Sequence, residues 1–158
     1  MIMTKIISYG DAKNSIDFDV LIVIASAFGI GKAIATEFAK IGCNVFVSAR
    51  RANELERLKE ELEEYEDNIH IFPCNVASSA NVEQTCKKIT SEFKLDCLIN
   101  NAGITSFKAA EDNSVNEIND IINTNLLSSL YTIKSVLPVF KKAQSGAIIN
   151  VLSNWPDF

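Results

Sequence analysis

The sequence predicts an α/β protein in which a parallel sheet of about five strands carries helices on both faces. Short apolar runs rich in Val and Ile alternate with segments of helical periodicity, and this alternation is typical of parallel sheets with helical crossovers. The first run, Val20–Ile24, is continuously apolar, as expected for a strand buried on both faces. The chain has 158 residues, 47% of them hydrophobic, which suffices for one such domain.

The elements follow one another regularly after a polar leader over residues 1–19. We expect the strands at 20–24, 44–48, 69–74, 95–99 and 147–152. We expect three helices between them at 30–41, 51–64 and 80–93. A fourth, longer and more apolar helix begins at the capping box of Ser114 and Glu117 and contains Pro138 near its end. Residues 20–158 then form a single domain.

Charge and composition exclude several classes of function. The net charge of −5 and the sequence pI of about 4.9 argue against a nucleic-acid partner. The uncharged stretch 20–31 is too short to span a bilayer, and no basic helix suggests a membrane surface. With one histidine, His70, and four cysteines in no CxxC pair, we expect buried thiols and no metal site. Acidic residues interrupt the leader, so a cytoplasmic location is expected.

A tight glycine turn joins the first strand to the first helix. Gly29 and Gly31 allow close approach of a ligand to the backbone, and the helix N-terminus favours an anion. A P-loop is excluded, because Ser26 stands where that loop needs glycine and Ala33 follows Lys32. The strand-turn-helix setting therefore favours a phosphate-containing ligand of another class.

Four motifs in order make the chain resemble the short-chain dehydrogenase/reductase family over residues 20–153. They are AxxxGxG from Ala25, NNAG at 100–103, the pair Asn125 and Leu126, and IINVLS ending at Ser153. The resemblance implies a Rossmann-like, doubly wound parallel sheet, incomplete at its C-terminal side. A receiver-like or flavodoxin-like domain is the alternative, but a receiver needs acidic residues at the end of the first strand, and none is present there.

The resemblance implies an NAD(P)-dependent oxidoreductase that acts on an alcohol or carbonyl. Enzymes of the family that use NAD place an acid at the end of the second strand, where this chain has Ala49 followed by Arg50. Arginine suits a 2′-phosphate, so NADP(H) is preferred over NAD(H), unless Arg50 and Arg51 merely begin a charged helix. The implied cofactor contacts are Ala25, Ser26, Phe28, Gly29, Ile30, Gly31, Arg50, Asn75, Val76, Asn101, Ala102 and Gly103.

The catalytic pattern of the family is only half present. Asn125 and Ser153 occupy two of its positions, but no Tyr-x-x-x-Lys follows Ser153. Tyr9 and Lys13 have that spacing in the leader, where nothing predicts a helix. We therefore expect a shortened member that is not active alone, and whether it is an enzyme stays open.

The alternatives are a non-catalytic module that binds a dinucleotide or a partner, and a remnant without function. Exposed apolar surface on the long helix and at the edge of the fifth strand favours a homo-oligomer or association with a complementary chain.

Overall fold

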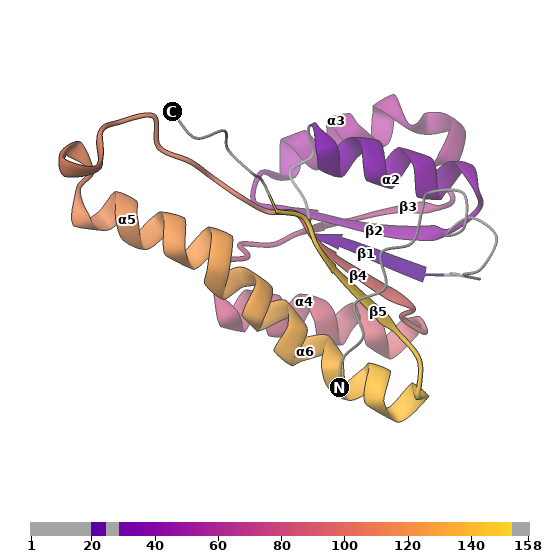
Figure 1. Ribbon diagram of the computed structural model, residues 1–158. Helices are drawn as coiled ribbons and strands as arrows, with labels where there is room; N and C mark the ends of the chain where they lie inside the picture. Colours follow the sequence, from indigo (N-terminus) through magenta and orange to yellow (C-terminus); the bar gives the residue numbers. More distant parts are fainter. Residues whose placement is uncertain (1–19, 25–28, 153–158) are drawn as a thin grey trace.

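A computed structural model describes residues 20–24 and 29–152 of the chain (Figure 1). Its parallel strands form one sheet in the order β3-β2-β1-β4-β5. The strands are β1 (Val20–Ile24), β2 (Asn44–Ala49), β3 (Ile69–Pro73), β4 (Cys97–Asn100) and β5 (Ala147–Asn150). The order reverses between β1 and β4, so the carboxyl ends of these two strands mark the point where doubly wound sheets bind ligands. The predicted fold class is confirmed.

The helices cover both faces of this sheet (Figure 1). One face carries α2 (Ile30–Lys40) and α3 (Ala52–Glu61), and the other carries α4 (Ser79–Glu92) and α6 (Ser128–Ala143). Helix α5 (Val115–Ile122) precedes α6 and projects past the carboxyl ends of the strands. Two short 3₁₀ turns lie in the connections, η1 (Glu63–Tyr65) before β3 and η2 (Ala110–Asp112) before α5.

Alternation along the strands divides the interior into two cores. Val45 and Val47 of β2 pack toward α2 and α3, whereas Phe46 packs toward α4 and α6. This follows from the two-residue period of a strand. All four cysteines are buried, as predicted. Burial also raises the pKa of Cys86 and Cys97 to about 12, so both behave as apolar residues at neutral pH.

The long helix differs from the sequence prediction in its middle. It is continuous from Val115 to Ala143, but five residues, Asn123–Leu127, form a π-helical turn, η3, between α5 and α6. Pro138 lies inside α6, and the helix continues beyond it to Ala143. Strand β4 begins two residues later than predicted and β5 ends two residues earlier, although the Val151 N–H still donates to the Asn100 carbonyl at 2.8 Å.

A buried polar network joins the sheet to the long helix. The Thr132 hydroxyl of α6 donates to the Asn100 side chain of β4 at 2.7 Å, and the Asn100 amide donates to Asn150 of β5 at 2.9 Å. Thr132 is fully buried and Asn100 nearly so. The network fixes the edge strand and α6 to the centre of the sheet.

Replacing Thr132 by valine is expected to lower the free energy of unfolding by about 1–3 kcal/mol, because it leaves the buried Asn100 oxygen without its donor. Thr90→Val is the matched control. The Thr90 hydroxyl donates to the Cys86 carbonyl within α4 at 2.8 Å, so its loss should cost well under 1 kcal/mol. Urea denaturation of both variants measures the difference, and equal losses would mean that the network adds no stability.

The predicted capping box at the start of α5 is confirmed. The Glu117 N–H donates to the Ser114 hydroxyl at 3.3 Å, and the Ser114 N–H donates to the Glu117 carboxylate at 2.9 Å. Lys108 forms an ion pair with the same carboxylate. Lys108 and the Ser114 donors together lower the pKa of Glu117 to about 2.

Acidification is therefore expected to weaken α5 already above about pH 2, the pKa of Glu117 in the folded protein. A carboxylate whose pKa is lowered by folding stabilises the folded state above its unfolded pKa, near 4.5, and loses that contribution as the pH falls toward about 2. The protection of the α5 amides against hydrogen exchange, relative to the intrinsic exchange rate at each pH, should fall over this window. Glu117→Gln should remove the pH dependence, whereas Glu111→Gln, a nearby acid outside the box, should retain it.

Candidate functional site

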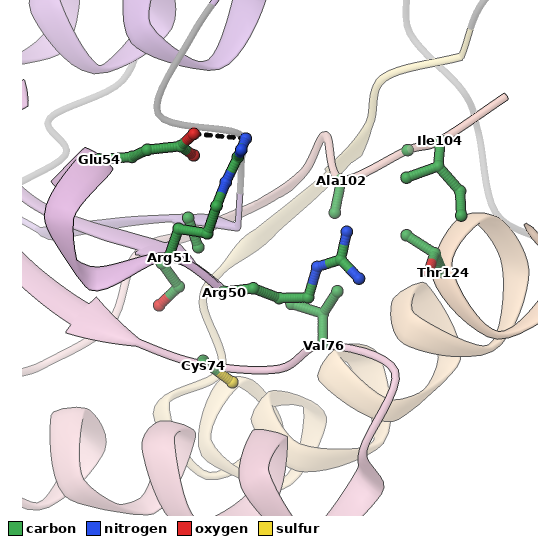
Figure 2. A pocket seen from close by; sticks show the side chains of 11 residues that line it. Arg50, Arg51, Glu54, Cys74, Val76, Ala102, Ile104 and Thr124 are labelled. Atoms are coloured by element: carbon green, nitrogen blue, oxygen red, sulfur yellow. Dashed lines mark ion pairs between the residues drawn. The ribbon is translucent and has the colours of Figure 1, made fainter. Parts of the chain in front are cut away.

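A pocket of about 160 Å³ opens at the carboxyl ends of the strands (Figure 2). Its walls come from residues 48–51 with Glu54, from Cys74 and Val76, from residues 102–104, and from Thr124. The first of these segments spans the end of β2 and the start of α3, the next two follow β3 and β4, and Thr124 belongs to the π-helical turn η3. The pocket thus lies where the topology of a doubly wound sheet predicts a ligand.

Two neighbouring arginines at the pocket differ in their charge environment. The Arg51 guanidinium forms an ion pair with the Glu54 carboxylate. Arg50 is exposed and has no ion pair with any residue that the structure describes. In Figure 2 the Arg50 side chain reaches across the pocket toward Ala102 and Thr124, while Arg51 turns away to Glu54. Arg50 is therefore the cation that an anionic ligand would meet.

The inner wall of the pocket is mostly apolar and carries one unsatisfied hydroxyl. Cys74 and Val76 are buried, and Ala102 packs against the same core. The Ser48 side chain is 1% exposed, and its oxygen has no hydrogen-bond partner among the residues that the structure describes. Such a surface suits a flat apolar group with polar edges.

The structure brings together part of the predicted site. Arg50, Val76, Ala102 and Gly103 all line the pocket. Asn75 lies beside it on the surface, where its side-chain oxygen accepts from the Ala77 N–H at 3.2 Å. Four predicted site residues, Ala25, Ser26, Phe28 and Ser153, lie outside the described residues.

The remaining predicted residues do not line the pocket. Asn101 is half-buried next to it, and it is Asn100 that holds the central strands together. At the start of α2, Gly29 has φ +63°, a conformation that favours glycine. Ile30 is exposed and Gly31 is buried.

Asn125 fixes the loop that follows β4. Its side-chain amide donates to the Ile104 carbonyl at 2.8 Å, and its side-chain oxygen accepts from the Ile104 N–H at 2.8 Å. The Asn125 oxygen also lies near Gly103, where a Cβ atom would come within 3.8 Å of it. This paired contact sets one wall of the pocket, because Ile104 lines it.

The sequence motifs did not point to Ser48, Cys74, Ile104 and Thr124, which also line the pocket. Ser48 could have been found, since strand alternation places it on the same side as Phe46 and near the end of β2. Thr124 had no such signal, because the packing of the long helix brings it to the pocket. Among the described residues, no three His, Cys, Asp or Glu side chains gather as a metal site requires.

Comparison with known proteins decides the family. A family model described as short chain dehydrogenase matches residues 19–156. The chain belongs to the short-chain dehydrogenase family. It is 35% identical over 135 residues to the uncharacterized oxidoreductase YxjF of Bacillus subtilis, covering 85% of this chain and 52% of that protein. The chain thus spans about half the length of the curated relatives that it matches.

Solved short-chain dehydrogenases have the same fold. ElxO with NADP bound superimposes with a TM-score of 0.79 at 32% identity, covering 89% of this chain and 59% of that one. The closed form of serine dehydrogenase complexed with NADP+ gives a TM-score of 0.78 at 30% identity, covering 87% and 56%. Within the described part of this chain, no helix combines the length and apolar character needed to cross a membrane.

Proposed function

We propose that this short-chain dehydrogenase binds NADP(H) through the pocket at the carboxyl ends of β2, β3 and β4. The observation that carries the proposal is Arg50, an exposed arginine at the pocket without an ion pair among the described residues. Ala49, which precedes it, offers no carboxylate that would repel a 2′-phosphate. ElxO and serine dehydrogenase, whose structures contain NADP or NADP+, support the same cofactor class.

The pocket residues fit the adenosine part of such a cofactor. Arg50 would hold the 2′-phosphate, with the geometry and charge that favour phosphate. The apolar side chains of Val76 and Ala102 would contact the adenine, and Asn75 and Asn101 would lie at the adenosine edge. The pyrophosphate would lie against the glycine turn and the N-terminus of α2, where Gly29 exposes backbone to a ligand.

Chemistry by this chain alone is not expected. The bound nicotinamide cofactor supplies the hydride, and the family uses Asn125, Ser153 and a Tyr-x-x-x-Lys pair around the substrate. No such pair follows Ser153 in residues 1–158, and carbonyl reduction needs a general acid. We therefore propose the cofactor-binding half of an oxidoreductase, with turnover requiring the tyrosine and lysine from additional chain.

Titration of the purified chain with NADPH and NADH tests the proposal, with the fluorescence of the reduced nicotinamide as the signal. Saturable binding that is tighter for NADPH supports it. A folded chain that binds neither cofactor would refute it. The same sample, mixed with a panel of carbonyl compounds, should show no oxidation of NADPH, and measurable oxidation would contradict the expected lack of turnover.

A second candidate function is association with another protein chain. Large apolar side chains are exposed along most of the long helix, at spacings of three, four or seven residues: Val115, Ile118, Ile122, Leu126, Leu130 and Leu137. The edge strand β5 adds Ile149, which is 43% exposed. A contiguous apolar stripe of this kind is typical of protein interfaces, and either a second copy or a complementary chain would bury it.

Light scattering coupled to size exclusion tests this association. The chain should elute as a dimer or larger species, and Leu126→Glu with Leu130→Glu should shift it toward monomer. Ile41→Glu is the control, because Ile41 is 55% exposed but lies on the opposite face of the sheet, at the end of α2. A monomeric wild-type chain at high concentration would exclude self-association.

A further inference from the structure

We propose that the Ser48 hydroxyl donates a hydrogen bond to the adenine base of the bound cofactor and so contributes to recognition of the base. This inference rests on the proposed function, because it concerns the same pocket. It assigns to Ser48 a contact that the family motifs did not suggest, and it comes from an unsatisfied buried atom.

The Ser48 hydroxyl lacks a partner at a place where one is expected. The side chain is 1% exposed, and within the described part of the chain its oxygen has no hydrogen bond. Most buried side-chain polar atoms in folded proteins have a partner, and an unpaired one destabilises the fold. The same strand position could hold alanine without that cost. A partner that arrives with the ligand explains why a hydroxyl stands there.

The register of β2 directs Ser48 into the pocket. Ser48 pairs with Ile24 of β1 and with Phe72 of β3, so it lies in the interior of the sheet. By alternation it faces the same core as Phe46, and it lines the pocket that Arg50 overhangs. The hydroxyl therefore lies at the buried end of the pocket, and the arginine lies at the exposed end.

The surroundings of Ser48 favour a planar base over a phosphate. A phosphate would need cationic partners, and Arg50, which lines the pocket and has no ion pair among the described residues, is exposed. The pocket wall also includes Cys74, Val76 and Ala102, which belong to or pack against the core that Ser48 faces and can contact the faces of a purine ring. A purine offers ring nitrogens in its plane as acceptors for a serine hydroxyl. The pocket volume of about 160 Å³ also exceeds the roughly 10–15 Å³ that one water requires.

Ser48→Ala should produce two opposite changes. The nucleotide affinity of the variant should fall about fivefold, for NADPH and NADH alike, because both carry adenine. The melting temperature of the ligand-free variant should rise, because an unpaired buried hydroxyl has been removed. A variant that simply misfolds cannot give this combination. Ser135→Ala is the matched control: its hydroxyl donates to the Tyr131 carbonyl at 2.8 Å within α6, and it should leave affinity unchanged without raising the melting temperature.

Analogues of 2′,5′-ADP identify the atom that Ser48 contacts. Carbon replaces one ring nitrogen at a time, and each analogue is titrated against wild type and Ser48→Ala. The affinity of wild type should be about fivefold lower for one analogue than for the parent compound. The Ser48→Ala variant should bind that analogue and the parent compound equally well. Ring substitutions that weaken both proteins equally would overturn the proposal, as would a Ser48→Ala variant with wild-type affinity.

The two failures are distinguishable. If wild type binds neither NADPH nor NADH, the proposed function fails and the Ser48 contact fails with it. If wild type binds the cofactors and Ser48→Ala binds them equally well, only the Ser48 contact fails. A raised melting temperature with unchanged affinity would mean that the Ser48 hydroxyl forms no hydrogen bond with the cofactor.

Discussion

Replacing Arg50 by glutamine is expected to lower the affinity for NADPH by about 10–100-fold, while the affinity for NADH changes by no more than about twofold. Hydrogen bonds to a charged group contribute about 1.5–3 kcal/mol, and each 1.4 kcal/mol corresponds to a factor of ten. Arg50 can give its full charge to the 2′-phosphate, since it has no ion pair within the described structure. NADH lacks that phosphate, so it loses no charged contact.

Parallel titrations of NADPH and NADH measure this selectivity. Arg57→Gln is the control: it removes the same charge from an exposed position on α3 that does not line the pocket. The control should retain the NADPH preference, and higher salt should weaken NADPH binding in wild type more than in Arg50→Gln. An equal loss of both cofactors in Arg50→Gln would show that Arg50 contacts the base or pyrophosphate instead.

The sheet and its order of elements could be predicted because the signals are local. A continuously apolar strand such as Val20–Ile24 and the capping box at Ser114 depend on neighbours in sequence. The π-helical turn at Asn123–Leu127 could not be predicted, because no proline or glycine marks it. Its position coincides with the paired hydrogen bonds from Asn125 to Ile104, a contact between segments 21 residues apart.

The site also contains residues that local sequence predicts and residues that only tertiary packing brings to the pocket. The resemblance to the family implied a role for Arg50 at the end of the second strand, and Arg50 lines the pocket. Within NNAG the sequence could not tell which asparagine binds the neighbouring strand. Alternation puts Asn100 inside the sheet, where it meets Thr132 and Asn150, and leaves Asn101 half-buried beyond it. Thr124 lines the pocket because the long helix packs beside it, and no short sequence motif predicts that packing.

Gly146→Ala should be among the most destabilising single substitutions in the described part of the chain, lowering the free energy of unfolding by about 4 kcal/mol. Gly146 has φ +144°, and a Cβ atom there would lie 2.3 Å from the Phe140 ring. Backbone strain of this kind costs about 1–3 kcal/mol, and overpacking adds about 1–3 kcal/mol. Phe140 is buried in the core between α6 and the sheet, so its ring cannot move into solvent.

Gly42→Ala separates the two contributions. Gly42 has φ +87° with no atom within 4 Å of the Cβ position, so its substitution should cost only the strain, about 1–2 kcal/mol. Phe140→Ala supplies the second comparison, because it removes the Cγ, Cδ1 and Cδ2 atoms that a Cβ at position 146 would overlap. In that background Gly146→Ala should cost about as much as Gly42→Ala. Urea denaturation of the single and double variants gives the coupling energy. If Gly146→Ala costs no more than Gly42→Ala in the wild-type background, the Phe140 ring does not restrict residue 146, and only the backbone conformation requires glycine there.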